Sequence, residues 1–135
     1  MTDVLQAVTI APDVDPDTEW WWTELADGRV MIPHCRACDR HFFPPIPGCP
    51  HCGSADIDAS RTTGEGTVYS WIVVHHALDE LFVGHTPYTV VAVQLDAEGV
   101  RLFGRIADGH VDENTKVRAV PYVVDGVTLL GFERI

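Results

Sequence analysis

The segments Cys35-Arg36-Ala37-Cys38 and Cys49-Pro50-His51-Cys52 contain all four cysteines of the chain. A Cys-x-x-Cys pair forms a tight turn that directs two sulfur atoms toward one point. Two such turns supply four thiolates, a ligand set that suits the tetrahedral coordination of zinc. The sequence therefore predicts one structural zinc ion per chain, with four ligands: Cys35, Cys38, Cys49 and Cys52.

Disulfides and iron are the alternatives for these cysteines. Disulfides need an oxidising compartment, and residues 1–17 lack the basic start, apolar core and cleavage site of a signal peptide. No apolar run approaches the ~20 residues that span a bilayer, so we predict a cytoplasmic protein.

Iron, as in rubredoxin, stays open as the metal. Gly53 follows the second pair as in a rubredoxin knuckle, whereas Asp39 follows the first, and this departure favours zinc.

Four cysteines close a tetrahedral shell, whereas a catalytic zinc keeps one position open and usually has three protein ligands. The metal is therefore predicted to be structural. His34, His41 and His51 flank the pairs and could replace a ligand, but four cysteines make this unnecessary.

Charge argues against a nucleic-acid role. The chain has 135 residues, enough for one modest domain or a small domain with a metal-bound appendage. Its net charge is −11, from 20 acidic and 9 basic residues. Binding to phosphates needs clustered Lys and Arg side chains, and Arg29, Arg36 and Arg40 are the only basic residues near the cysteines.

A short helix is predicted over residues 15–28, after an unpatterned arm over residues 1–14. Asp15 can cap the helix, Pro16 suits its first turn, and Gly28 can end it in a left-handed conformation. Three consecutive tryptophans, Trp20, Trp21 and Trp22, sweep ~200° around the helix axis, so they cannot all face one core. They either pack on the chain's own barrel and ribbon or dock into a partner protein, where tryptophan is enriched at hot spots.

The rest of the chain is predicted to be β-structure. A strand over residues 29–34 leads into the first cysteine pair, and the proline-rich residues 41–47 form an edge or an extended loop. Five strands then follow, over residues 66–77, 86–96, 100–107, 116–124 and 127–133. This number and spacing fit a small barrel of the OB-fold type, with a sandwich fragment as the alternative.

The predicted fold class is thus mainly β, with an N-terminal helix, a rubredoxin-like zinc ribbon and a C-terminal five-stranded OB-fold barrel. We place the boundaries of these parts at residues 1–28, 29–60 and 61–135.

No catalytic residues are predicted. The sequence has no Gly-rich phosphate loop, no nucleophile elbow and no paired-carboxylate motif. The cysteines are assigned to metal, and the serines have no base that the sequence identifies. Four further histidines are most simply explained as exposed side chains or as side chains whose hydrogen bonds are made within the fold: His75, His76, His85 and His110.

Several motifs in a fixed order carry a family resemblance. They are Trp21-Trp22, Gly28-Arg29-Val30, the pair at Cys35 and Cys38, the run from Phe43 to Gly53, the run from Gly64 to Trp71, and the run from Pro87 to Val93. Together they resemble the zinc-ribbon plus OB-fold proteins that accompany thiolase-superfamily enzymes, long labelled a domain of unknown function. The resemblance covers residues 15–135.

The resemblance implies a non-catalytic accessory subunit that binds and activates a thiolase-superfamily acyl-CoA enzyme and helps to form the acyl-CoA passage. Similar proteins accompany thiolases, acyltransferases and the thiolase-like aldolases of steroid side-chain degradation, some together with a hotdog-fold enoyl-CoA hydratase. Arg101 and Arg105 could line such a passage or simply form a solvated strand face, and the charge of −11 disfavours a dominant CoA-phosphate site on this chain. A free-standing acyl-CoA or small-ligand binding barrel and a rubredoxin-like redox module are the alternative functions.

Overall fold

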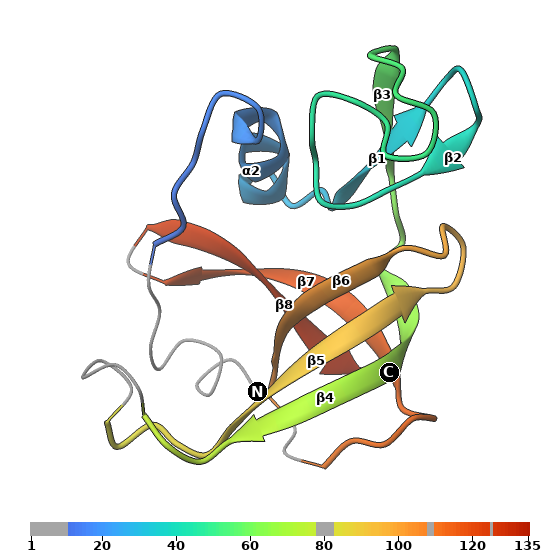
Figure 1. The fold of residues 1–135 in the computed structure, drawn as a ribbon. Coiled ribbons are helices and arrows are strands. Elements are labelled where there is room, and N and C mark those ends of the chain that lie inside the picture. Colours follow the sequence, from blue (N-terminus) through green and yellow to red (C-terminus); the bar gives the residue numbers. More distant parts are fainter. Residues whose placement is uncertain (1–10, 78–82, 108–109, 125) are drawn as a thin grey trace.

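The computed structural model describes residues 11–77, 83–107, 110–124 and 126–135. In these ranges a short helix and a three-stranded sheet lie together at one end of a closed five-stranded barrel (Figure 1). The small sheet contains β1 (Met31–Cys35), β2 (Arg40–His41) and β3 (Ile57–Arg61). The barrel contains β4 (Glu65–Val74), β5 (Tyr88–Leu95), β6 (Arg101–Ile106), β7 (Lys116–Val124) and β8 (Val127–Arg134). The predicted fold class is confirmed.

The helix α2 (Glu19–Ala26) begins later than predicted. The N-cap position of α2 belongs to Thr18 rather than to Asp15. Asp15 instead caps the turn that leads into the helix, because its carboxylate accepts a hydrogen bond from the Thr18 amide at 2.9 Å. The predicted end is confirmed. Gly28 has φ of +85°, and the Arg29 amide donates to the Glu24 carbonyl at 2.9 Å. These features define a Schellman cap, which glycine favours because it lacks a Cβ.

The small sheet has the order β2-β1-β3 and is antiparallel throughout. The β2 strand ends at His41, and the Phe42 amide still donates to the Pro33 carbonyl on β1 at 3.1 Å. The proline-rich residues that follow cross to the second cysteine pair outside any strand, as the prolines there predict. Phe42 is buried against Cys35 and Cys49. Phe43 packs elsewhere, with its ring centroid 5.5 Å from that of Trp21.

The barrel closes in the order β4-β5-β6-β8-β7. All neighbours are antiparallel except β6 and β8, which pair in parallel at Arg105–Gly131 and Ile106–Phe132. Closure distinguishes this fold from the sandwich fragment that the strand pattern also allowed. The first barrel strand ends at Val74, three residues earlier than predicted. His75 and His76 therefore lie outside the strand, and both are exposed.

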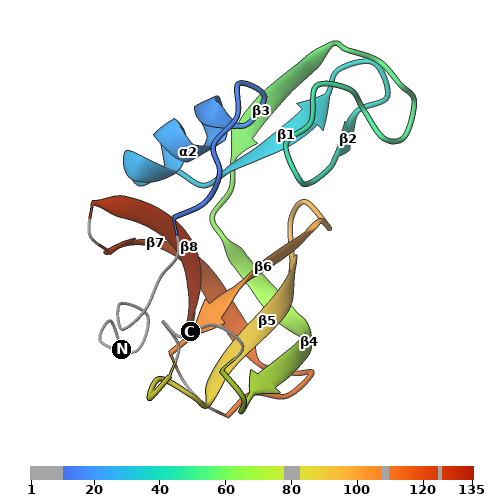
Figure 2. The ribbon, with the colours of Figure 1, turned by 60° about the vertical axis from the view of Figure 1, so that its left-hand side comes forward.

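One hydrophobic core runs from the helix into the barrel. Trp21, Leu25 and Ile32 belong to the same buried cluster as Val93 and Phe132. Both views place α2 and the small sheet on the same end of the barrel (Figures 1 and 2). The proposed boundaries at residues 28/29 and 60/61 remain a prediction, since a shared core does not define where parts begin.

The connection between the small sheet and the barrel is also fixed by hydrogen bonds. The Thr62 amide donates to the Val30 carbonyl at 3.0 Å, and the Ala119 amide donates to the Gly64 carbonyl at 2.9 Å. The Thr62 hydroxyl donates to Glu98 at 2.7 Å. These bonds attach the small sheet to the barrel on both sides of the connection.

Among the described residues, no helix has the length and apolarity needed to cross a membrane.

Candidate metal centre

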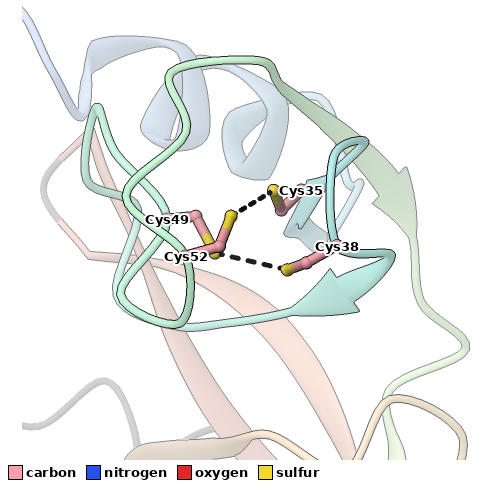
Figure 3. A group of neighbouring side chains, drawn as sticks. All are labelled: Cys35, Cys38, Cys49 and Cys52. Atoms are coloured by element: carbon pink, nitrogen blue, oxygen red, sulfur yellow. Dashed lines mark hydrogen bonds between the residues drawn. The ribbon is translucent and has the colours of Figure 1, made fainter.

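The four cysteine sulfurs meet at the tip of the small sheet. Cys35 is the last residue of β1, Cys38 lies in the turn to β2, and Cys49 and Cys52 lie on the following loop. The four Sγ atoms lie within 4.8 Å of one another. Cys35–Cys52 and Cys38–Cys49 are each 3.6 Å apart (Figure 3). A disulfide would bring two sulfurs to about 2.05 Å, so the structure describes four separate thiols.

These separations fit a tetrahedral thiolate site. Four ligands at the Zn–S distance of about 2.3 Å form a tetrahedron with edges of about 3.8 Å, close to the 3.6 Å observed for two of the edges. Three of the sulfurs belong to buried or half-buried residues and the fourth, Cys52, to an exposed one. The predicted four-residue group is therefore assembled, and it forms a candidate metal site.

The two cysteine turns have the same backbone geometry. The Asp39 amide donates to the Cys35 carbonyl and the Gly53 amide to the Cys49 carbonyl, each at 2.8 Å. Asp39 has φ of +59° and Gly53 φ of +79°. Asp is one of the few residues that adopt the left-handed region without a large cost. Asp39 therefore takes the place of glycine in the first turn. Contrary to the expectation from the sequence, the residue that follows the first cysteine pair does not discriminate zinc from iron.

Backbone amides prepare one cysteine for metal binding. Burial disfavours the Cys49 thiolate, but hydrogen bonds from the Cys52 and His51 amides outweigh it and lower the pKa of the Cys49 thiol to about 6. The His51 amide lies 3.3 Å from the Cys49 sulfur. In contrast, burial and a hydrogen bond with Cys49 raise the pKa of the Cys38 thiol to about 12. A bound cation supplies the positive charge that keeps all four as thiolates, so metal binding must release protons.

The flanking histidines lie outside this group. Within the described residues, the atoms that cluster at the tip come from cysteines alone. His34 uses both ring nitrogens elsewhere, at 2.7 Å from an oxygen of Asp58 and 2.7 Å from an oxygen of Asp39. His41 Nε2 lies 3.2 Å from the Ser60 hydroxyl.

His34 is expected to titrate at a higher pH than an ordinary histidine. Hydrogen bonds to Asp39 and then Asp58 favour the imidazolium and raise its pKa above the usual 6.5. This interaction stabilises the fold fully below the unfolded pKa of about 6.5, and the stabilisation is lost as the pH rises through the folded pKa. NMR titration of metal-loaded protein should place the His34 midpoint above 6.5.

Asp58→Asn should lower that midpoint, because it removes one of the two carboxylates. Asp56→Asn is the matched control, since Asp56 pairs with Arg36 in the same region. A His34 midpoint at or below about 6.5 in the unchanged protein would contradict this prediction.

The three tryptophans separate into different environments. Trp21 is 4% exposed, and its indole N–H donates to the Met31 carbonyl at 2.8 Å. Trp22 is half-buried, with its ring edge-on to that of Trp21. Trp20 is 36% exposed. Trp21 therefore belongs to the chain's own core, and Trp20 and Trp22 retain surface for a partner, so the docking role remains a prediction.

The pairing of Ser60 with His41 was not foreseen from the sequence, because 19 residues separate them. Register explains it: His41 pairs with His34 on β1, and Ser60 pairs with Ile32, two residues away along the same strand and therefore on the same face. The pair is in hydrogen-bond contact on the exposed surface of the small sheet.

The sequence matches two family models in succession. Residues 22–58 match the ChsH2 rubredoxin-like zinc ribbon domain, and residues 60–124 match the ChsH2 C-terminal OB-fold domain. The first match begins within α2 and ends within β3, and the second covers β4 to β7 and ends before β8.

Two curated relatives are similar over most of this chain. A "Probable enoyl-CoA hydratase alpha subunit" of Thermomonospora curvata is 40% identical over 120 residues, which is 89% of this chain and 36% of the relative. The chain thus spans about a third of that protein's length. A "DUF35 domain-containing scaffold protein" of Pyrococcus furiosus is 30% identical over 100 residues, covering 68% of this chain and 72% of the relative.

Solved structures share the fold. A chain of the structure described as "Ltp2-ChsH2(DUF35) aldolase" superposes with a TM-score of 0.80 and 34% identity, covering 91% of this chain and 98% of that one. A DUF35 protein of unknown function from Sulfolobus solfataricus has a TM-score of 0.65 and 17% identity over 90% of this chain and 87% of its own, which supports the fold alone. The chain belongs to the ChsH2 family of DUF35 proteins, which join a rubredoxin-like zinc ribbon to an OB-fold domain.

Proposed function

We propose that this chain is a non-catalytic accessory subunit of a thiolase-superfamily acyl-CoA enzyme. One observation carries the proposal: the chain matches 98% of a chain in a structure described as an Ltp2-ChsH2 aldolase, at 34% identity. The Pyrococcus relative, described as a scaffold protein, supports the same role. The steroid side-chain aldolases and the hydratases that accompany them are the partner classes we favour.

Zinc is the metal we propose for the four-cysteine site, one ion per chain. It would be held by four thiolates with no position left for substrate, so its contribution would be to hold the two cysteine turns together. We expect the complex in the cytoplasm, where thiolates remain reduced.

The partner surface is proposed to include the exposed parts of α2. Trp20 and Trp22 present aromatic surface next to the barrel, and large aromatic side chains supply much of the binding energy at protein interfaces. The acyl-CoA passage would be formed mainly by the partner, because a chain with a net charge of −11 is poorly suited to hold CoA phosphates alone.

Trp20→Ala and Trp22→Ala are expected to weaken the complex, by ~2 kcal/mol or more if either residue is a hot spot. Calorimetry or size-exclusion chromatography with an aldolase or thiolase partner from the native host measures the loss. Trp71→Ala is the matched control, since Trp71 is 38% exposed on β4. Full binding after both α2 changes would remove the helix from the interface.

The proposed function itself is tested by activity. The isolated chain should cleave no acyl-CoA substrate, whereas adding it to the partner should raise the retro-aldol or thiolytic rate. Robust cleavage by the chain alone would overturn the accessory role. Isolation from the native host without any large partner would instead favour a free-standing ligand-binding barrel, and iron in the purified protein would favour a redox module.

A further inference from the structure

A cleft of about 570 Å³ lies between the helix and the outer face of the barrel. Its volume lies in the range of small-molecule sites. Trp22 and Phe43 line it from the helix and the ribbon loop, and Val90, Phe103 and Leu129 line it from three barrel strands. Figure 2 shows the helix above the β7 and β8 strands, and all three elements contribute to the lining. Most of the lining is apolar, so an occupant must be largely apolar as well.

Tyr122 on β7 lines the cleft and carries a polar group that the chain leaves unpaired. The residue is 7% exposed, and within the ranges that the structure describes its hydroxyl makes no hydrogen bond. Burial raises the pKa of the phenol, so the hydroxyl stays protonated at neutral pH and is able to donate. Buried polar groups nearly always have a partner, so this exception indicates that the acceptor comes from outside the chain.

The backbone of β8 makes room for the ring of Tyr122. A Cβ on Gly131 would lie 2.9 Å from Tyr122 Cε1, which is too close for any larger residue without rearrangement. Gly131 precedes Phe132, which is fully buried in the core, so alternation along the strand places Gly131 on the outer face. The ring of Tyr122 therefore lies against the outer face of the sheet, which is the face that bounds the cleft.

The charged residues on the lining favour a neutral occupant. Arg105 has interactions of its own within the chain and also lies over the Tyr88 ring, with its guanidinium 5.7 Å from the ring centroid, so it is not counted as a donor here. The Asp15 carboxylate accepts from the Thr18 amide at 2.9 Å and from the Thr18 hydroxyl at 3.1 Å. Asp13 is exposed, where water screens its charge. A charged ligand would thus lose its hydration against apolar walls without a counter-charge committed to it, which is costly.

We propose that this cleft binds a small, neutral, largely apolar molecule with one carbonyl oxygen, which accepts a hydrogen bond from the Tyr122 hydroxyl. The aromatic rings of Trp22 and Phe43 suit a ring system in the rest of the ligand. A carbonyl fits better than an alcohol, because it brings acceptor lone pairs and no donor that would need a partner among apolar walls. This binding activity goes beyond the accessory role and does not depend on it.

2-Acetylnaphthalene is the probe, added to the full chain with its metal site loaded. It has two fused rings and one ketone, and the expected result is a saturable set of NMR shifts at the Gly104 and Gly131 amides and at the Trp22 indole. The resonance of its carbonyl carbon should move downfield on binding, as a hydrogen bond requires. 2-Naphthoate has nearly the same shape with a negative charge, and it should bind at least about tenfold more weakly because its charge is desolvated.

Tyr122→Phe should weaken binding of the ketone about threefold to tenfold, which is the net value of one hydrogen bond exchanged with water. The same variant should not weaken binding of 2-isopropenylnaphthalene, in which a CH₂ group replaces the ketone oxygen. Comparing the two ligands in the two proteins isolates the hydrogen bond from any general effect on the cleft. Tyr69→Phe is the matched control, because it removes the same hydroxyl from a tyrosine that is 55% exposed on β4.

Three results would overturn the proposal: shifts that do not saturate, 2-naphthoate binding as tightly as the ketone, or a Tyr122→Phe variant that affects the ketone and the isopropenyl compound equally. Loss of the ketone at Tyr69→Phe to the same extent as at Tyr122→Phe would also overturn it. Failure of the chain to bind any partner enzyme, with ketone binding intact, would contradict the proposed function but leave this inference standing.

Discussion

Cys49→Ser is expected to abolish metal binding and unfold the tip of the small sheet. Its Sγ lies 3.6 Å from that of Cys38 in the four-sulfur group, and despite its burial two backbone amides lower the pKa of its thiol to about 6, which favours the thiolate that binds a cation. The apolar packing at the tip is small. In the part of the chain that the structure describes, the buried cluster there consists of Cys35, Phe42 and Cys49, with Cys38 and Ile57 packed against it, and three of these five are candidate ligands. Apparent binding energies of ~10–16 kcal/mol are typical of structural zinc sites, so the loss exceeds what this small cluster can replace.

The barrel should survive the same change. The base of the small sheet belongs to the larger core through Val30 and Ile32, and it does not depend on the sulfurs. The NMR spectrum of Cys49→Ser should therefore lose dispersion over residues 35–57 and keep it over the barrel strands. If four thiolates hold the metal, elemental analysis should give about one zinc per chain for the unchanged protein and none for the variant.

His51→Gln is the matched control for this experiment, since His51 lies between the two cysteines of the second pair with an exposed side chain. It should retain the metal in full. Metal retained at full stoichiometry by Cys49→Ser, or lost from His51→Gln, would contradict a site made of four cysteines. Iron in place of zinc would contradict the metal assignment but leave the ligand set unchanged.

The cysteine spacing predicted the centre because each pair is local. A Cys-x-x-Cys turn is closed by one backbone bond, and four thiolates at two such turns restrict the coordination geometry. The five barrel strands were predicted for a similar reason, since β-branched residues and the turns at Gly99 and Gly126 are also local signals. The strands β2 and β3 of the small sheet were not predicted. The end of α2 was predicted because Gly28 acts on its own turn.

The features that were missed depend on contacts between distant segments. Asp15 was expected to cap the helix, and only the structure shows that its carboxylate is used one turn earlier. Arg105, Tyr122 and Gly131 lie on three different strands, and the pairing of β8 with both β6 and β7 brings them together. Periodicity indicates a strand but not its neighbour, so the contact between these residues could not be predicted from the sequence.

Phe132→Ala is expected to lower the free energy of unfolding by ~3–5 kcal/mol. Phe132 is fully buried, and it is among the largest of the fully buried side chains. It pairs with Ile106 on β6 and with Ala119 on β7, so its ring fills the barrel where the parallel pair closes it. Gly104 leaves space for the ring, because a Cβ there would lie 2.9 Å from Phe132 Cε2. Tight packing on several sides restricts collapse around the deleted ring, which places the expected cost in the upper part of the range for core truncations.

Phe103→Ala is the matched control, since it removes the same side chain from a position that is 67% exposed. Its effect should stay within about 0.5 kcal/mol, as for most surface substitutions. Urea denaturation of both variants with metal bound measures the change in the free energy of unfolding. The transition is monitored in parallel by a signal from the barrel and a signal from the helix. Because Leu25 and Trp21 share the buried cluster with Phe132, the helix and barrel signals should shift to lower urea together. A Phe132→Ala variant in which only the barrel signal shifts would show that the helix and ribbon are stabilised independently of the shared core.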